Sequence, residues 1–268
     1  MQRITKLVLP VAGLGKRLLP LTKQLPKSLV KVCGKPLVEY VLEEAMKSSI
    51  REVILIVNPL HKKQFQSYVK KHKNRFSFKF RICEQLTPGG NGHAIVQAYD
   101  FLKKAPFVVR FCDDIIVSPR PITASLADLF RAKNSPIVLL ERVPKSIVSR
   151  FGVVATIGRP EASEFGFGGK IHRISNIVEK PAPKYAPSNL TIVGGYALTP
   201  HIIKNLKSIA DTLPVIADDA LPIAVALQLE LITGGKVYGW EFLGDRLDCG
   251  TIESLKRAEN YLNSGSGL

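Results

Sequence analysis

Two glycines and two cations stand together near the start of the chain, in the stretch PVAGLGKRLLP. Gly13 and Gly15 let a backbone loop approach a ligand closely, and Lys16 and Arg17 place positive charge beside it. Such a loop, after an apolar strand and leading toward a helix, is typical of phosphate sites in α/β proteins. The pattern matches neither G-x-G-x-x-G, because Leu18 replaces the third glycine, nor G-x-x-x-x-G-K-[ST], because Arg17 replaces the hydroxyl. The stretch therefore predicts a phosphate site without naming the ligand.

Carboxylates stand at two further places where an apolar run gives way to polar residues. Asp113 and Asp114 follow the run FVVRFC, and Asp248 lies in the glycine-flanked stretch FLGDRLDCG. Aspartates in such places can serve as turn or cap residues. Next to a phosphate loop they have a second use, because proteins hold magnesium with carboxylate oxygens beside phosphates. Asp113 and Asp248 are therefore a candidate metal site.

Two shorter stretches have residues suited to a sugar phosphate and to a nucleobase. In IVEKP, Glu179 can accept hydrogen bonds from hydroxyl groups and Lys180 can supply a point charge to a phosphate, although a surface ion pair has the same composition. In EQLTPGGNGHA, the glycines let the backbone approach a flat base. We expect His93, near the end of that stretch, to start a helix rather than to act in catalysis.

Expected strands and helices alternate over the first half of the chain. Apolar runs typical of strands covered on both faces occur at residues 6–12, 52–58, 76–83, 107–114 and 136–143. Helical patterns occur at residues 36–49, 61–73, 92–105 and 122–133. This alternation predicts a doubly wound, mainly parallel sheet, in which ligands bind at the carboxyl ends of the strands. After residue 150 the runs are strand-like with glycine and proline between them, so we expect mixed or antiparallel strands there rather than a new domain.

Length and composition limit the class of protein. The chain has 268 residues, of which 46% are hydrophobic, and this suits one large α/β domain. No apolar run reaches the ~18 residues that span a bilayer, and no signal peptide is recognisable, so we expect a cytoplasmic protein without a membrane partner. The four cysteines form no C-x-x-C pair, which indicates neither a zinc cluster nor a disulfide framework.

The net charge of the chain is +16. The lysines between residues 62 and 75 are typical of a solvated helix face, and they lack the interleaved aromatic residues of single-strand nucleic-acid binders. We therefore expect no nucleic-acid partner. A positive field of this size equally suits an anionic small substrate.

The order of the motifs along the chain is more specific than any one of them. The stretches that carry it extend over nearly the whole chain: PVAGLGKRLLPLTKQLPKS, GGNGHAI, FCDDI, FGVV, VEKPAPKYAPSNLTIVGGYALTP and GDRLDCG. In this order they resemble the nucleotidyltransferases that make nucleoside-diphosphate sugars, and within these the uridylyltransferases that act on glucose 1-phosphate. The resemblance implies one Rossmann-like domain over residues 1–268, with a nucleotide-binding half at about 1–118 and a sugar-phosphate-binding half at about 119–268.

The same resemblance implies roles for particular residues. Nucleotide binding falls to residues of the first half, namely Ala12, Gly13, Leu14, Gly15, Lys16, Arg17, Lys27, Gln85 and Gly90. Binding of glucose 1-phosphate falls to residues of the second half, namely Gly152, Glu179, Lys180 and Gly194. The catalytic groups would be Arg17, Lys27, Asp113 and Lys180, and the ligands of a magnesium ion would be Asp113 and Asp248. A uridylyl group would pass from UTP to glucose 1-phosphate, with UDP-glucose and pyrophosphate as products.

The chain departs from the family pattern at three places. Lys16 stands where the family has Thr or Ser, so a cation replaces a hydroxyl beside the triphosphate. The stretch DDALPIA, with Asp219 in place of a glutamate, replaces an acidic segment of the family. The segment between Tyr68 and Arg81 is shorter than in the uridylyltransferases, where an extra helical region helps form subunit contacts.

These departures leave three alternatives open. The chain is a uridylyltransferase, a sister enzyme that uses dTTP or another sugar phosphate, or a catalytically weakened paralogue that regulates its relatives. A homo-oligomer, either a dimer or a tetramer, is compatible with each of them.

Overall fold

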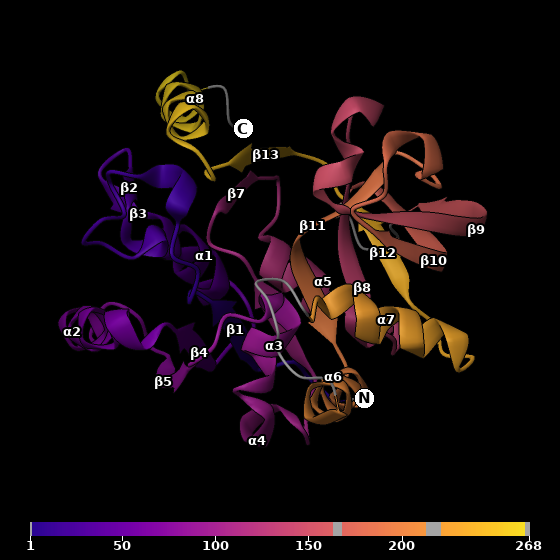
Figure 1. Ribbon diagram of the computed structural model, residues 1–268, viewed down its shortest axis with the longest axis horizontal. Helices are drawn as coiled ribbons and strands as arrows, with labels where there is room; N and C mark the ends of the chain where they lie inside the picture. The colour runs from indigo at the N-terminus through magenta and orange to yellow at the C-terminus, as the bar shows by residue number, and fades with distance from the viewer. Residues whose placement is uncertain (1, 163–167, 213–220, 266–268) are drawn as a thin grey trace.

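One large sheet runs through the molecule. The computed structural model describes residues 2–162, 168–212 and 221–265, so Asp219 lies outside the described residues. Nine strands form the sheet in the order β5-β4-β1-β6-β11-β8-β12-β10-β9 (Figure 1). In that order the strands are Lys79–Glu84, Glu52–Val57, Lys6–Pro10, Phe107–Arg110, Leu190–Leu198, Ile137–Arg142, Tyr238–Glu241, Lys170–Glu179 and Gly152–Ala162.

The direction of the strands changes from one side of the sheet to the other. β5, β4, β1 and β6 are parallel to one another. β11 is antiparallel to both β6 and β8, and β10 is antiparallel to both β12 and β9. The prediction of a mainly parallel sheet followed by mixed and antiparallel strands is therefore confirmed.

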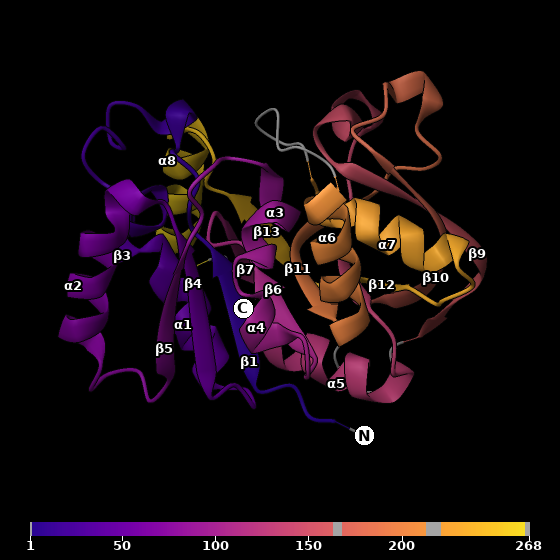
Figure 2. The same ribbon diagram turned by 60° about the horizontal axis from the view of Figure 1, so that its bottom comes forward.

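Helices cover both faces of the sheet because its central strands are apolar on both faces. In β1, Leu7 and Leu9 pack into one core and Val8 packs into the other. The first core also includes residues of α1 (Leu37–Met46), α2 (Lys62–His72), α5 (Ile122–Lys133) and α8 (Ile252–Asn263). The second includes residues of α3 (Gly90–Val96), α4 (Tyr99–Leu102), α6 (Pro200–Thr212) and α7 (Ile223–Ile232). Figure 2 shows α3, α4, α6 and α7 in front of the sheet, with α1 and α8 behind it.

Two predicted elements were wrong in their extent. The expected strand 107–114 ends at Arg110, and the chain then turns, with the amide of Asp114 bonding back to the Phe111 carbonyl at 3.5 Å. It resumes as β7 (Asp114–Val117) in a separate two-stranded sheet. The expected helix 92–105 is two helices, because the amides of Gln97 and Ala98 bond three residues back and tighten the turn between α3 and α4.

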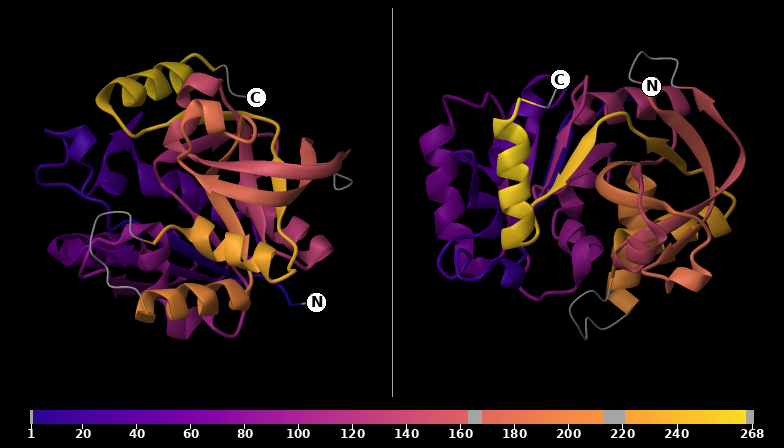
Figure 3. Two further views of the ribbon diagram at one scale, coloured as in Figure 1. Left: turned by 45° about the vertical axis from the view of Figure 1, so that its right-hand side comes forward. Right: turned by 90° about the horizontal axis from the view of Figure 1, so that it is seen from above.

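The C-terminal segment crosses the molecule. After β12, the chain forms β13 (Asp245–Asp248), which pairs antiparallel with β7. It then enters α8 through a capping box made by Thr251 and Ser254. Figure 3 shows this yellow segment passing from the side of β9 and β10 to the side of α1 and α2. The last strand of the chain thus lies beside residues encoded much earlier.

None of the helices in the described ranges combines the length and the apolar character needed to cross a membrane.

Candidate active site

A cavity of about 570 Å³ opens at the carboxyl ends of the parallel strands. Its lining includes Val11, Asn58, Gln85 and Phe111, which directly follow β1, β4, β5 and β6. This is the edge at which open α/β sheets bind ligands. Ten of the residues predicted to form the site line this one cavity, namely Ala12, Gly13, Leu14, Gly15, Lys16, Arg17, Lys27, Gln85, Gly90 and Asp113.

The glycine loop after β1 keeps its backbone open to the cavity. A Cβ atom added to Gly13 would meet no heavy atom within 4 Å, so a ligand can approach the main chain there. Gly15 has φ +65°, and a Cβ on it would come within 2.9 Å of Thr22 and 3.0 Å of Lys27. The hydroxyl of Thr22 donates to the Gly15 carbonyl at 2.8 Å. Glycine is therefore needed at position 15, because the loop folds back against Lys27.

The expected helix after this loop is not there. A short 3-10 turn, Lys16–Leu18, follows Gly15, and the first α-helix begins only at Leu37. Any phosphate held by the loop therefore depends on loop amides and on side chains, and not on the dipole of a long helix.

Lys27 and Asp113 form the central charged pair of the cavity. The Lys27 ammonium donates to Asp113 Oδ2 at 2.6 Å, and the Lys27 side chain is 17% exposed. Burial raises the pKa of the Asp113 carboxyl, but the charge and hydrogen bond of Lys27, together with Arg17, outweigh it and hold the pKa below its usual value. Asp113 is thus a carboxylate, ready to bind a cation.

The turn at Gly250 brings Asp248 close to this pair. The amide of Cys249 donates to the Asp113 carbonyl at 2.7 Å, which joins the two segments. A Cβ on Gly250 would lie 2.8 Å from Asp248 Oδ1 and 3.2 Å from Arg17 Nη2. Arg17 therefore reaches from the glycine loop to the turn that follows Asp248. Asp248 itself also accepts a contact from Arg150 at 3.5 Å.

The donor set fits a magnesium ion that is bound together with substrate phosphates. Asp113 and Asp248 offer carboxylate oxygens from adjoining segments. In the described part of the chain, no group of three or more His, Cys, Asp or Glu side chains is arranged to hold a metal. Magnesium is commonly bound through one or two carboxylates and the phosphates of the substrate, so two such residues are sufficient.

A second group of polar residues lies at the Gln85 end of the cavity. Gln85 is buried, and its side-chain amide contacts the Gly90 carbonyl at 3.3 Å and His93 Nδ1 at 3.1 Å. Burial lowers the pKa of His93, so the ring is neutral near pH 7. His93 lies within α3, where it orients Gln85 and contacts Gln97.

The residues predicted to bind the sugar phosphate do not line the 570 Å³ cavity. Gly194 lies beside it, because the Gly194 carbonyl accepts from the N–H of Phe111, which lines the cavity. Gly152 and Glu179 are paired across β9 and β10. Gly194 N–H donates to Asp114 Oδ2 at 3.1 Å. Burial raises the pKa of Tyr196, and the charges of Glu179 and Asp114 raise it further. Glu179 and Asp114 therefore both lie near Tyr196.

Lys180 stands at the edge of the same group. It has φ +47°, and its amide donates to the Phe151 carbonyl at 3.0 Å. This bond ties the end of β10 to the residue before Gly152.

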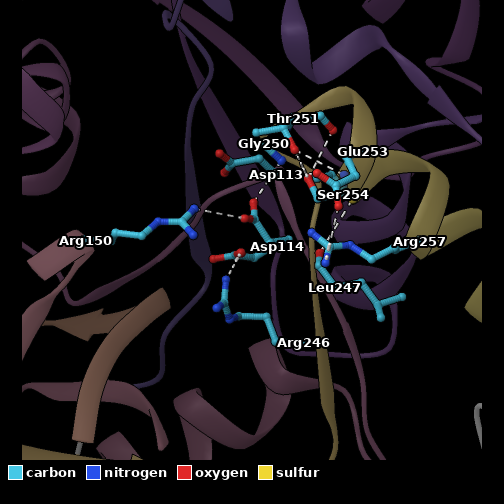
Figure 4. Close-up of polar contacts among 12 residues, drawn as sticks. Asp113, Asp114, Arg150, Arg246, Leu247, Gly250, Thr251, Glu253, Ser254 and Arg257 are labelled. Atoms are coloured by element: carbon cyan, nitrogen blue, oxygen red, sulfur yellow. Dashed lines mark hydrogen bonds and ion pairs between the residues drawn. The ribbon is translucent and has the colours of Figure 1, made fainter. Parts of the chain in front are cut away.

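Several residues of the site had escaped the sequence analysis. Asn58 lines the cavity directly after β4, and the rule for the carboxyl ends of parallel strands would have found it. Arg246 and Arg150 contact aspartates that lie 132 and 98 residues away in sequence, respectively. No local pattern indicates such partners. Figure 4 shows Arg150 to the left of the aspartates and Arg246 below Asp114, both away from the start of α8.

Comparison with protein families supplies the decisive observation, because the nucleotidyl transferase family model matches residues 6–265. The chain belongs to the nucleotidyl transferase family. Members of this family generally use a divalent metal ion. As a nucleotidyl transferase, the chain has the predicted family fold, and its glycine loop lies at the predicted edge of the sheet.

Named relatives and solved structures lie within the same family. A UTP–glucose-1-phosphate uridylyltransferase from Staphylococcus epidermidis is 30% identical over 93% of this chain and 89% of its own length. A UDP-glucose pyrophosphorylase structure in complex with UDP-glucose has a TM-score of 0.83 at 28% identity, covering 98% of this chain and 99% of that one. A UTP-bound UGPase structure from Acinetobacter baumannii has a TM-score of 0.79 at 25% identity, covering 97% and 93% of the two chains. This nucleotidyl transferase is thus similar to those proteins over nearly its full length.

Proposed function

We propose that this nucleotidyl transferase moves a uridylyl group from UTP to glucose 1-phosphate, giving UDP-glucose and pyrophosphate. One observation carries the proposal: a single cavity presents the glycine loop, the Lys27–Asp113 pair and the Gln85–Gly90 pair at the carboxyl ends of four parallel strands. The substrates are inferred from the uridylyltransferase that is 30% identical over 93% of the chain.

The chemistry that such a site must perform is mainly electrostatic. The attacking group is a phosphate oxygen that is already anionic, so no general base is needed. Repulsion between two polyanions opposes the reaction, and cations must cancel it while attack stays in line with departure. Arg17 would hold the β and γ phosphates, Lys27 the reacting phosphate, and Lys180 the phosphate of the sugar.

Asp113 and Asp248 would hold magnesium between the two substrates. When bound, the ion neutralises phosphate charge and orients the reacting groups. The residues of this chain supply the rest of the binding. Lys27 would exchange part of its contact with Asp113 for one with the reacting phosphate.

The remaining roles divide between the two sides of the sheet. Gln85 and Gly90 would read the edge of the uracil, and Gly152, Glu179 and Gly194 would line the sugar. These residues come from both proposed halves, about 1–118 and 119–268, and we propose that the halves form one catalytic domain because the large sheet includes strands of both. A cytoplasmic location and a homo-oligomeric state are further parts of this proposal.

The assay for this function is pyrophosphate release from each of four nucleoside triphosphates, combined with glucose, galactose and mannose 1-phosphates. We expect UTP with glucose 1-phosphate to give the highest kcat/KM, and only with a divalent cation present. A preference for dTTP or another sugar phosphate would identify a sister enzyme. Absence of turnover with every pair would contradict the proposal and favour the regulatory paralogue.

Lys16 offers a test of the phosphate loop. Its exposed side chain lines the cavity, where the family has a hydroxyl. A charge-assisted bond to phosphate contributes about 1.5–3 kcal/mol. We expect Lys16→Thr to raise the dissociation constant for UTP at least about tenfold, and to leave that for glucose 1-phosphate within about twofold. Isothermal titration calorimetry measures both constants.

Lys23→Thr is the matched control, because Lys23 is exposed on the same loop and does not line the cavity. Equal UTP affinity in the Lys16 variant, the control and the parent would place the Lys16 ammonium in solvent. A higher turnover number in Lys16→Thr would show instead that the lysine obstructs the triphosphate.

A further inference from the structure

Arg246 occupies a buried position between the two sides of the site. Its side chain is 10% exposed. Nη1 donates to Asp114 Oδ1 at 2.8 Å, and Nε donates to Glu141 Oε2 at 2.6 Å. Figure 4 shows its guanidinium directed at Asp114. A planar guanidinium can hold two carboxylates in fixed directions, which a lysine ammonium cannot do as well.

The two carboxylates belong to different parts of the fold. Asp114 begins β7, which is separate from the large sheet, and Glu141 lies in β8 near the middle of that sheet. Arg246 itself lies in β13, the strand that crosses the molecule. Its guanidinium carbon is also 5.4 Å from the centre of the Phe151 ring, next to Gly152. One side chain thus connects the crossing strand with elements on both sides of the site.

The second carboxylate oxygen of Asp114 accepts a hydrogen bond from Gly194, a proposed sugar-binding residue. Asp114 Oδ2 accepts from Gly194 N–H at 3.1 Å, and a Cβ at position 194 would lie only 2.6 Å from that oxygen. The Gly194 carbonyl accepts from Phe111 N–H at 3.0 Å and from Arg110 Nε at 3.1 Å. Gly194 is therefore held at both its amide and its carbonyl, and Asp114 supplies the contact at the amide.

The pairing of β13 with β7 also sets the position of Asp248. Arg246 and Asp248 are two residues apart in β13, so their side chains leave the strand on the same face. In the pairing of β13 with β7, Asp248 lies opposite Asp114. A shift of Arg246 relative to Asp114 would therefore move a proposed metal ligand and a proposed sugar contact at once.

We infer that Arg246 is a positioning residue that sets the distance between Asp248 and Gly194, and hence between the activated phosphate and the sugar phosphate that attacks it. The inference rests on the proposed function. Arg246 touches neither substrate in this account. It acts through Asp114, Glu141 and the register of β13.

A purely structural ion pair would behave differently. Removing one partner of a buried pair leaves an uncompensated charge and lowers stability. Such a loss lowers the melting temperature but leaves the kinetic constants of the folded molecules unchanged. Displacement of a reacting group by ~1 Å lowers the rate by about 10²-fold even in a stable protein. Kinetics and stability therefore separate the two roles.

The test compares Arg246→Lys with Arg75→Lys. Arg75 is a matched control, because its guanidinium also joins two carboxylates, those of Glu39 and Glu43, at a place that does not line the catalytic cavity. Both substitutions keep the positive charge. Melting temperature, the dissociation constant for UTP, and kcat and KM for glucose 1-phosphate are measured for each variant and the parent, together with the magnesium concentration that gives half-maximal activity.

We expect Arg246→Lys to lower kcat/KM for glucose 1-phosphate at least about tenfold, and to raise the half-maximal magnesium concentration. UTP affinity stays within about threefold, because the contacts of Arg246 described above go to Asp114, Glu141 and Phe151 rather than to Arg17 or Lys27. Arg75→Lys shows the parent's kinetics. In the double variant with Asp114→Asn, Arg246→Lys adds little further loss, because the two residues act as one unit.

Parent-like kinetics in folded Arg246→Lys, or full additivity with Asp114→Asn, would overturn this inference and leave the proposed function in place. Absence of turnover in the parent would instead overturn the proposed function, and the inference with it.

Discussion

Asp113→Asn is expected to lower turnover at least about 10³-fold while the protein stays folded. Asp113 is the carboxylate on which Lys27 and the proposed magnesium ion converge. Loss of ~4 kcal/mol of charge stabilisation in the transition state corresponds to this factor. An asparagine has nearly the same shape, so the bond from Cys249 N–H to the backbone carbonyl of residue 113 is retained. The measurement is the initial rate of pyrophosphate release over a range of magnesium concentrations.

Asp100→Asn is the matched control for this substitution. Asp100 also accepts from a lysine ammonium, that of Lys103, at 2.6 Å, but it lies in α4 and does not line the cavity. We expect the turnover number of the Asp100→Asn variant to equal that of the parent. Full activity of the parent in excess chelator, or of Asp113→Asn at any magnesium concentration, would contradict the metal role of Asp113.

Lys27→Ala is expected to lower kcat about 10²-fold or more. The side chain is largely buried, its Cβ lies against the folded-back Gly15 loop, and its ammonium is held by Asp113, so the ammonium is preorganised before substrate arrives. Removing one preorganised donor of this kind has effects of this size in other enzymes. Single-turnover rates with saturating UTP and glucose 1-phosphate measure the chemical step separately from binding.

Lys103→Ala provides the comparison, since it removes the ammonium from the Asp100 pair outside the cavity. A loss of less than twofold in Lys27→Ala would mean that this lysine neutralises Asp113 and does not reach the reacting phosphate. Recovery of most activity in Lys27→Arg would indicate that any cation at this place is sufficient.

The sequence was a good guide to elements with strong local signals. The unbroken apolar runs at 52–58 and 136–143 became β4 and β8, because strands buried on both faces need such composition. The loop around Gly13 and Gly15 lies at the predicted edge of the sheet, since the carboxyl ends of parallel strands share one edge.

Features that depend on partners far away in the sequence could not be predicted from local patterns of residues. The apolar run through Cys112 continues past the end of β6, so nothing in the run marks Arg110 as the last residue of that strand. The roles of Arg150 and Arg246 depend on β13 lying beside β7. Nothing within a short window of sequence specifies that pairing.

The crossing of β13 also separates two events in the synthesis of the protein. All nine strands of the large sheet have been translated once the ribosome passes Glu241. Asp248 and Arg246 follow later, and they reach their places only when β13 pairs with β7 and α8 packs onto the first core. A nascent chain can therefore build its sheet and its glycine loop while the proposed metal site is still incomplete. The proposed catalytic site is thus completed only after β13 has been translated, later than the framework that supports it.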